Sequence, residues 1–251
     1  MCDCFLYLFF FNSLKNKLLP KPISVVSLTI CLVVDIEFKN NQIWSRYIQD
    51  ARDSNLAIHL LVVSLDRSSC SSIPTDFLPN IDPSLLSDFC DASGKHSIVF
   101  RRLLASLALL ESAFNMYPDS SHFSLVCGDA IPVTSAADAI SLLNLNESWM
   151  SFPDRIAFTN EKSVKVNWMG NGENGIDTSQ FDQACFVRVE RFGFLFCNHH
   201  LNLLLKINSE LGGVKFSQFW SKMKYFYKDD AIYTYYPTAL ALLGYNNNYN
   251  N

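Results

Sequence analysis

The hydrophobic positions of this chain form two kinds of segment, continuous apolar runs and runs with helical spacing. Residues 24–38 and 56–65 are almost continuously apolar and rich in β-branched side chains, which predicts strands covered on both faces. Residues 43–55 lie between them and predict a helix that ends in a polar Arg-Asp-Ser-Asn sequence. The order of these segments predicts a β-α-β unit with two parallel strands.

Residues 97–143 predict a helix, a buried strand and a polar loop that opens a second helix. Apolar side chains recur at spacings of three and four residues, which places them on one helical face. They are Val99, Leu103, Leu107, Leu110 and Phe114. Turn-forming residues 117–121 end this helix, and residues 122–126 predict a short strand.

The loop from Gly128 to Ser135 leaves this strand at its carboxyl end. Open α/β sheets bind ligands outside the carboxyl ends of their strands, so a site is expected at this loop. Gly128 permits a sharp turn, and Pro132 restricts the residue before it to extended conformations. The alternative is a plain connection that ends in a helix N-cap at Thr134 or Ser135.

The second half of the chain predicts further strands and helices. Residues 184–197 are strand-like and lead into a helix that continues through Leu205. Residues 216–244 predict two helices, the second beginning at Ala231. The glycine- and asparagine-rich residues 169–179 lack the GxGxxG order, which argues against a dinucleotide or P-loop site.

Length and composition favour one large domain. The chain has 251 residues, of which 49% are hydrophobic and 18% are charged. The expected division is an apolar N-terminal segment of uncertain role at residues 1–23, one domain at 24–244, and a disordered tail at 245–251. The net charge is -4 with no basic run, so a nucleic-acid partner is not expected.

The cysteines and the N-terminus bear on the compartment. The eight cysteines include no CxxC pair, so a zinc site is not expected, while Cys70 and Cys90 are candidates for a disulfide. Asn146 begins an N-glycosylation sequon. Residues 4–11 are intensely apolar but too short to span a bilayer, and are interpreted either as a degenerate signal anchor or as the start of the domain.

Several segments, in this order along the chain, resemble the core-2/I-branching N-acetylglucosaminyltransferases and related plant proteins. The sequence CGDAIPVTS at 127–135 is similar to the family's loop of a small residue, Gly, Asp and Pro after a strand. Residues 186–191 are similar to a family strand, and Asp66 matches an acidic position where Ser64 replaces a frequent histidine. The resemblance implies an α/β fold of the glycosyltransferase-A type, with a mixed, mainly parallel sheet and helices on both faces.

The resemblance also implies an activity, namely inverting transfer of N-acetylglucosamine or a related sugar from a UDP-sugar to a glycan hydroxyl. Neither a metal nor another cofactor is implied. An Asp-Glu pair at a helix start supplies the family's catalytic base, and Asp230 takes the position of its glutamate. Candidate substrate-binding residues are Asp66, Gly128, Asp129, Lys228 and Asp229. The implied location is the Golgi or secretory lumen, with weak membrane association through the N-terminus.

Three departures from the family keep alternatives open. Asp230 is one methylene shorter than glutamate, and the acidic pair at 229–230 is also typical of a helix cap. No Lys or Arg follows Lys228, although the family neutralises the nucleotide diphosphate with downstream basic residues. Either Lys222, Lys224 or Lys228 does so, or the chain is incomplete, or it is an inactive glycan- or nucleotide-sugar-binding member. An unrelated α/β protein is the third interpretation.

One further acidic group has a form typical of metal binding. Asp35-Ile36-Glu37 is the acidic trio most similar in form to the Asp-x-Asp triplet of metal-dependent glycosyltransferases. Placed at the end of the first strand, its two acidic side chains would share one face. The alternative is the polar end of that strand.

Overall fold

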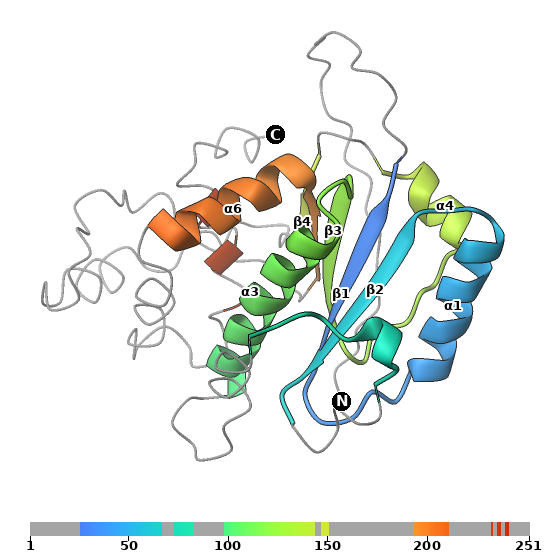
Figure 1. Ribbon diagram of the computed structural model, residues 1–251, viewed down its shortest axis with the longest axis horizontal. Helices are drawn as coiled ribbons and strands as arrows, with labels where there is room; N and C mark the ends of the chain where they lie inside the picture. The colour runs from blue at the N-terminus through green and yellow to red at the C-terminus, as the bar shows by residue number, and fades with distance from the viewer. Residues whose placement is uncertain are drawn as a thin grey trace, which may run out of the picture.

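The computed structural model describes residues 26–66, 73–82, 98–143, 147–150 and 193–210, together with the helical positions 232, 235, 236, 239 and 240. Its centre is a five-stranded sheet with the strand order β2-β1-β3-β5-β4 (Figure 1). The strands are β1 Leu28–Val34, β2 Ile58–Ser64, β3 His122–Cys127, β4 Trp149–Met150 and β5 Gly193–Cys197. The helices are α1 Asn41–Asp53, α3 Ile98–Met116, α4 Ala136–Ser141 and α6 Asn198–Glu210, with a 3-10 turn at Thr75–Phe77.

The strand directions make this a mixed, mainly parallel sheet. β1 pairs in parallel with both β2 and β3, so the predicted parallel pair of the first β-α-β unit is confirmed. β5 runs antiparallel to both β3 and β4. Of the five described strands, four therefore point the same way and β5 is reversed.

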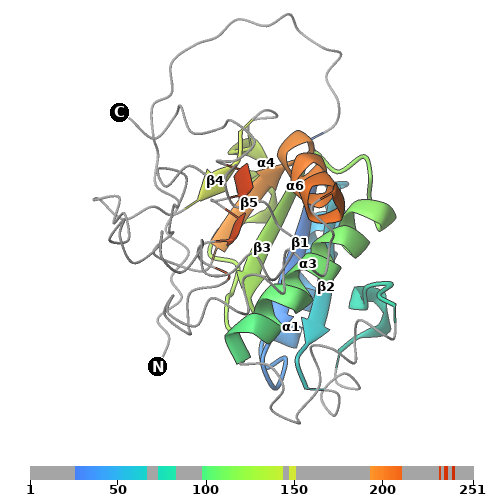
Figure 2. The same ribbon diagram turned by 90° about the vertical axis from the view of Figure 1, so that its left-hand side faces the viewer.

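Helices cover both faces of the sheet, as the sequence predicted (Figures 1 and 2). Successive strand residues point to opposite faces, so the continuous apolar run of β1 serves two cores. Leu32 packs in a cluster with Trp44 and Ile48 of α1. Cys31 packs in a second cluster with residues of α3 and α6.

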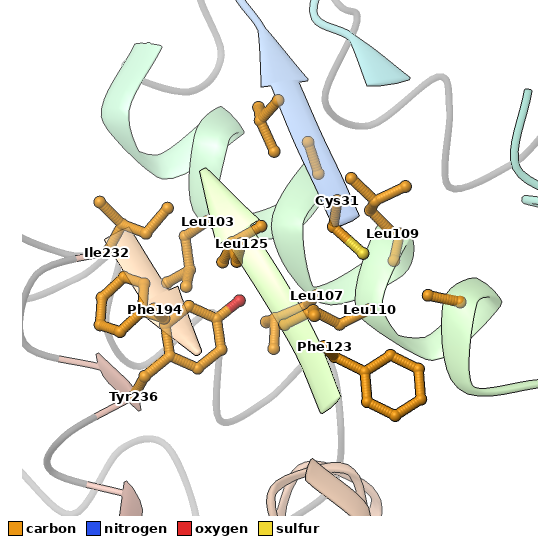
Figure 3. Close-up of a cluster of buried hydrophobic side chains, with 14 of the residues drawn as sticks. Cys31, Leu103, Leu107, Leu109, Leu110, Phe123, Leu125, Phe194, Ile232 and Tyr236 are labelled. Atoms are coloured by element: carbon orange, nitrogen blue, oxygen red, sulfur yellow. The ribbon is translucent and has the colours of Figure 1, made fainter. Parts of the chain in front are cut away.

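The α3 side of the sheet holds the larger cluster, part of which is drawn in Figure 3. Leu103, Leu107 and Leu110 are buried there, as the helical spacing predicted, while the side chain of Val99 lies outside the described residues. Burial also extends beyond that face, because Ala105 and other small side chains of α3 are fully covered. α3 is thus a central helix rather than a surface helix with one apolar stripe.

The described segment that follows the Asp-Asp pair packs onto this same cluster. Positions 232, 235, 236, 239 and 240 are helical, and their spacing puts them on one face. All five side chains are buried, which agrees with the helix predicted to begin at Ala231. Tyr236 packs against both Phe194 and Phe196, with ring centroids 5.1 and 5.4 Å away.

Several predicted strands are shorter in the structure than in the sequence analysis. The run at 24–38 gives only seven strand residues, and Asp35, Ile36 and Glu37 follow the strand instead of lying on it. The alternation of side chains in a strand therefore does not apply to Asp35 and Glu37, so the prediction that they share a strand face was wrong. Hydrophobic character alone could not locate the end of the strand within this run. Phe38 lies beyond the strand, yet it is buried in the cluster that contains residues of α1. Within the described residues, the strand predicted at 184–197 is confirmed at Gly193–Cys197.

No described helix combines the length and the apolar character needed to cross a bilayer. The apolar residues 4–11, the Cys70–Cys90 pair and the tail at 245–251 lie outside the described residues.

Candidate functional site

The carboxyl ends of β1, β2 and β3 meet at one edge of the sheet, the lower edge in Figure 1. Val34 of β1 is in register with Ser64 of β2, and Val33 is in register with Cys127 of β3. The residues that follow in each strand therefore leave the sheet side by side. Asp35, Leu65 and the Gly128-Asp129 pair form this row.

The connections make this edge a topological switch point. The chain leaves β1 through α1 on one face and reaches β3 through α3 on the other face, with clusters of buried residues on both sides. Connections that diverge in this way open a crevice at the carboxyl ends of the two central strands, where open α/β sheets bind ligands. The edge predicted from the loop sequence is therefore the edge that the topology selects.

Gly128 is needed here for a different reason from the one the sequence suggested. A Cβ at this position would lie 2.8 Å from the Val34 Cα and 2.7 Å from its Cγ2. The φ angle of Gly128 lies outside the left-handed region that favours glycine. Close approach of β3 to β1, and not a left-handed turn, accounts for the glycine.

We expect Gly128→Ala to destabilise the fold by about 1–3 kcal/mol, because the Val34 backbone cannot yield to the added methyl group. Thermal or urea unfolding monitored by circular dichroism would measure the change. Gly193→Ala is the matched control, since a Cβ there meets no atom within 4 Å. Equal losses in the two variants would contradict the close-approach argument.

The loop after β3 is held against the beginning of α1. The Asn40 Nδ2 donates to the Asp129 carbonyl at 3.3 Å, and the Trp44 Nε1 donates to the Ala130 carbonyl at 3.0 Å. At the end of the loop, Ser135 caps α4 by accepting from the Asp138 backbone N–H at 3.1 Å. The predicted N-cap is confirmed at the second of its two candidate positions. The Asp129 side chain remains exposed, in a position open to a ligand.

Asp66 follows β2 at the same edge, as the sequence predicted. Its backbone N–H donates to the Ser64 hydroxyl at 3.1 Å, a local turn that fixes the chain as it leaves the strand. Ser64 itself is buried and also donates to the Ile36 carbonyl at 3.4 Å. Ser64 therefore links the ends of two strands through its hydroxyl.

Two arginines at this edge were missed by the sequence analysis. Arg101 and Arg102 lie near the start of α3, which begins at the carboxyl edge because it runs back along strands β2 and β3. The Arg101 Nη2 donates to the Leu65 carbonyl at 2.6 Å, and Arg102 forms a salt bridge with Asp35. The sequence could have indicated them, because a basic pair at the start of a helix that connects two parallel strands lies near the carboxyl ends of the strands.

The remaining candidates do not belong to this described edge. Lys228, Asp229 and Asp230 lie outside the described residues, as do the alternative cations Lys222 and Lys224. Ile232 lies two residues beyond Asp230 in the sequence. It is buried in the same cluster as Leu103 of α3 (Figure 3).

The adjacent histidines of α6 lie at a separate place. The His200 Nδ1 is 2.7 Å from the Ser148 hydroxyl, which also accepts from the Cys197 backbone N–H at 2.9 Å. Burial, and secondarily the neighbouring His199, lowers the pKa of His200. His200 is therefore partly buried and hydrogen-bonded, whereas His199 is exposed. In the part of the chain that is described, no group of three His, Cys, Asp or Glu side chains is placed to hold a metal ion.

The described residues define an α/β protein with a mixed sheet and a topological switch point between β1 and β3. In comparisons with protein-family models, curated proteins and solved structures, the chain matches none of them.

Proposed function

We propose that the protein is an inverting glycosyltransferase that moves N-acetylglucosamine, or a related sugar, from a UDP-sugar to a glycan hydroxyl. The observation that carries the proposal is the row of polar residues at the switch-point edge. Asp66 and the Gly128-Asp129 pair, chosen from the sequence resemblance, follow β2 and β3, the two parallel strands on either side of β1. Carboxyl-end edges of this kind suit nucleotide ligands.

In the proposed reaction, the Asp230 carboxylate removes the proton from the acceptor hydroxyl. The hydroxyl oxygen attacks the anomeric carbon of the donor sugar, and the bond from that carbon to the UDP oxygen breaks with inversion. Asp66 contacts the nucleoside and Asp129 lines the sugar site, while Asp229 and Lys228 contact the substrate. A base must lie within hydrogen-bond reach of the proton it removes.

Ile232, two residues beyond Asp230, is buried on the α3 side of the sheet. Ile232 belongs to one cluster with Leu103, which directly follows Arg102 at the start of α3. No metal or other cofactor is part of the proposal. The Golgi or secretory lumen, with weak membrane association through the N-terminus, is the proposed location.

The test is UDP release from a panel of UDP-sugars with mixed glycan acceptors, with and without EDTA. We expect acceptor-dependent release that resists EDTA, together with UDP binding by calorimetry. GDP-sugars serve as the control for the nucleoside. Absence of both release and UDP binding would overturn the proposal.

The second candidate is a catalytically inactive glycan- or nucleotide-sugar-binding protein on the same fold. The short side chain of Asp230 favours it, because a carboxylate one methylene shorter than the family's glutamate reaches less far toward the acceptor. UDP-sugar binding without turnover of any donor would select this function over transfer.

A further inference from the structure

We propose that Arg101 and Arg102 bind the diphosphate of the nucleotide at the carboxyl edge. The inference rests on the proposed function for the identity of the nucleotide, but its geometry comes from the α3 end alone. It assigns the phosphate-binding role to the start of α3, whereas the sequence had offered only lysines near the C-terminus for it.

The first step of the argument is where the two guanidinium groups lie. The Arg102 Nε donates to the Asp35 Oδ1 at 2.7 Å, and its Nη2 donates to the other carboxylate oxygen. The Arg101 Nη2 donates to the Leu65 carbonyl at 2.6 Å. Asp35 and Leu65 are the first residues beyond the paired ends of β1 and β2. Neighbouring strands lie about 4.8 Å apart, so the two cationic groups cap adjacent strand ends.

The second step is access. The side chains of Arg102 and Asp35 are 36% and 39% exposed, so a ligand at this edge can contact the guanidinium without unfolding the helix. Arg101 is partly exposed as well. The two-point contact with Asp35 fixes the Arg102 side chain in one orientation, which lowers the entropy lost when it binds a ligand.

The third step is chemical fit. The planar guanidinium presents paired donors that match phosphate oxygens. Two guanidinium groups at adjacent strand ends match the two phosphates of a diphosphate. The amino end of α3 adds partial positive charge at the same place, since it also begins at this edge. When a sugar is transferred, the departing diphosphate gains charge, and fixed cations stabilise that charge.

A purely structural role predicts a different result. A partly exposed salt bridge contributes about 0–1 kcal/mol to stability, so the Arg102–Asp35 pair is not required for folding. Variants at both arginines should therefore remain folded, which makes ligand affinity a clean measurement.

The experiment measures binding of inorganic pyrophosphate, UDP and uridine by calorimetry at low salt. We expect Arg101→Ala and Arg102→Ala each to weaken pyrophosphate and UDP binding by roughly tenfold or more, with uridine binding unchanged. Arg102→Lys should fall between wild type and Arg102→Ala, because it keeps the charge and loses the fork. The matched control is Arg52→Ala in the last turn of α1, at the opposite edge, which should bind as wild type does.

The outcomes separate this inference from the function it rests on. Unchanged pyrophosphate binding in folded Arg101→Ala and Arg102→Ala variants would overturn the inference, even if the wild type binds UDP and transfers sugar. Arginine-dependent pyrophosphate binding without preference for UDP would support the inference and remove the UDP-sugar proposal. If an alanine variant does not fold, the lysine variants at both positions decide, and wild-type affinity in both would overturn it. Failure of the wild type to bind pyrophosphate would overturn it as well.

Discussion

Replacement of Asp230 by asparagine is expected to lower sugar transfer by about 10²–10⁴-fold, the contribution of a positioned general base. The amide has nearly the size of the carboxylate but cannot accept the acceptor's proton at neutral pH. The affinity for UDP should remain at the wild-type value, because the proposed diphosphate contacts come from the α3 end of the sheet. Rates of UDP release at saturating donor and acceptor, together with UDP affinity by calorimetry, measure the two effects.

Two variants of the same pair serve as controls. Asp229→Asn removes the same charge from the neighbouring residue, a proposed substrate contact, and is expected to lower transfer far less than Asp230→Asn, because it leaves the base in place. Asp230→Glu restores the side chain found in the resembled family and should retain transfer. If Asp230→Asn transfers sugar at the wild-type rate, Asp230 is not the base.

Replacement of Tyr236 by alanine is expected to destabilise the protein by about 3–5 kcal/mol, the range for removing a large aromatic side chain from a core. Tyr236 is fully buried against Phe194 and Phe196, and its hydroxyl is 2.6 Å from the Ser106 hydroxyl of α3. Ser106 donates its hydrogen to the Leu103 carbonyl at 2.8 Å, so the Tyr236 phenol is the donor between them. Burial raises the pKa of Tyr236 well above its usual range, which keeps the phenol protonated. Urea unfolding would give the free-energy change.

Two further variants separate the contribution of the Tyr236 hydrogen bond to stability from that of its ring. Tyr236→Phe keeps the ring and should cost about 1 kcal/mol, the net value of one hydrogen bond. Ser106→Ala in that background should add little, because the bond between the two hydroxyls is already gone. Equal losses from Tyr236→Phe and Tyr236→Ala would mean that the aromatic packing contributes little and the hydrogen bond dominates.

The elements that the sequence predicted well are those with local causes. The first β-α-β unit, the helix around Leu103 and the Ser135 cap each depend on spacing, side-chain shape or turn chemistry within a few residues. The predicted strand ends were less accurate. The run at 24–38 includes Phe38, which is buried in the cluster with α1 and is not part of the strand. Hydrophobic character does not distinguish a residue buried in this way from a strand residue.

The candidate site divides in the same way. Asp66, Gly128 and Asp129 were selected from the sequence, and they lie together at one edge because three parallel strands end in register there. The reason for Gly128 was not visible, since the Val34 backbone that excludes a side chain is distant in the sequence. Arg101 and Arg102 were passed over because their interest depends on Asp35 and Leu65, which belong to other elements.

The sequence by itself determined that the chain forms an α/β fold with parallel strands and a polar edge at their carboxyl ends. Its continuous apolar runs and helical spacings are local patterns, and burial of those side chains drives the corresponding elements to form. Tertiary structure alone decided that β5 is reversed, that Tyr236 joins the segment after Asp230 to α3, and that two arginines cap the ends of β1 and β2. These features depend on contacts between residues far apart in the chain, and no local pattern encodes which distant partner a side chain will meet.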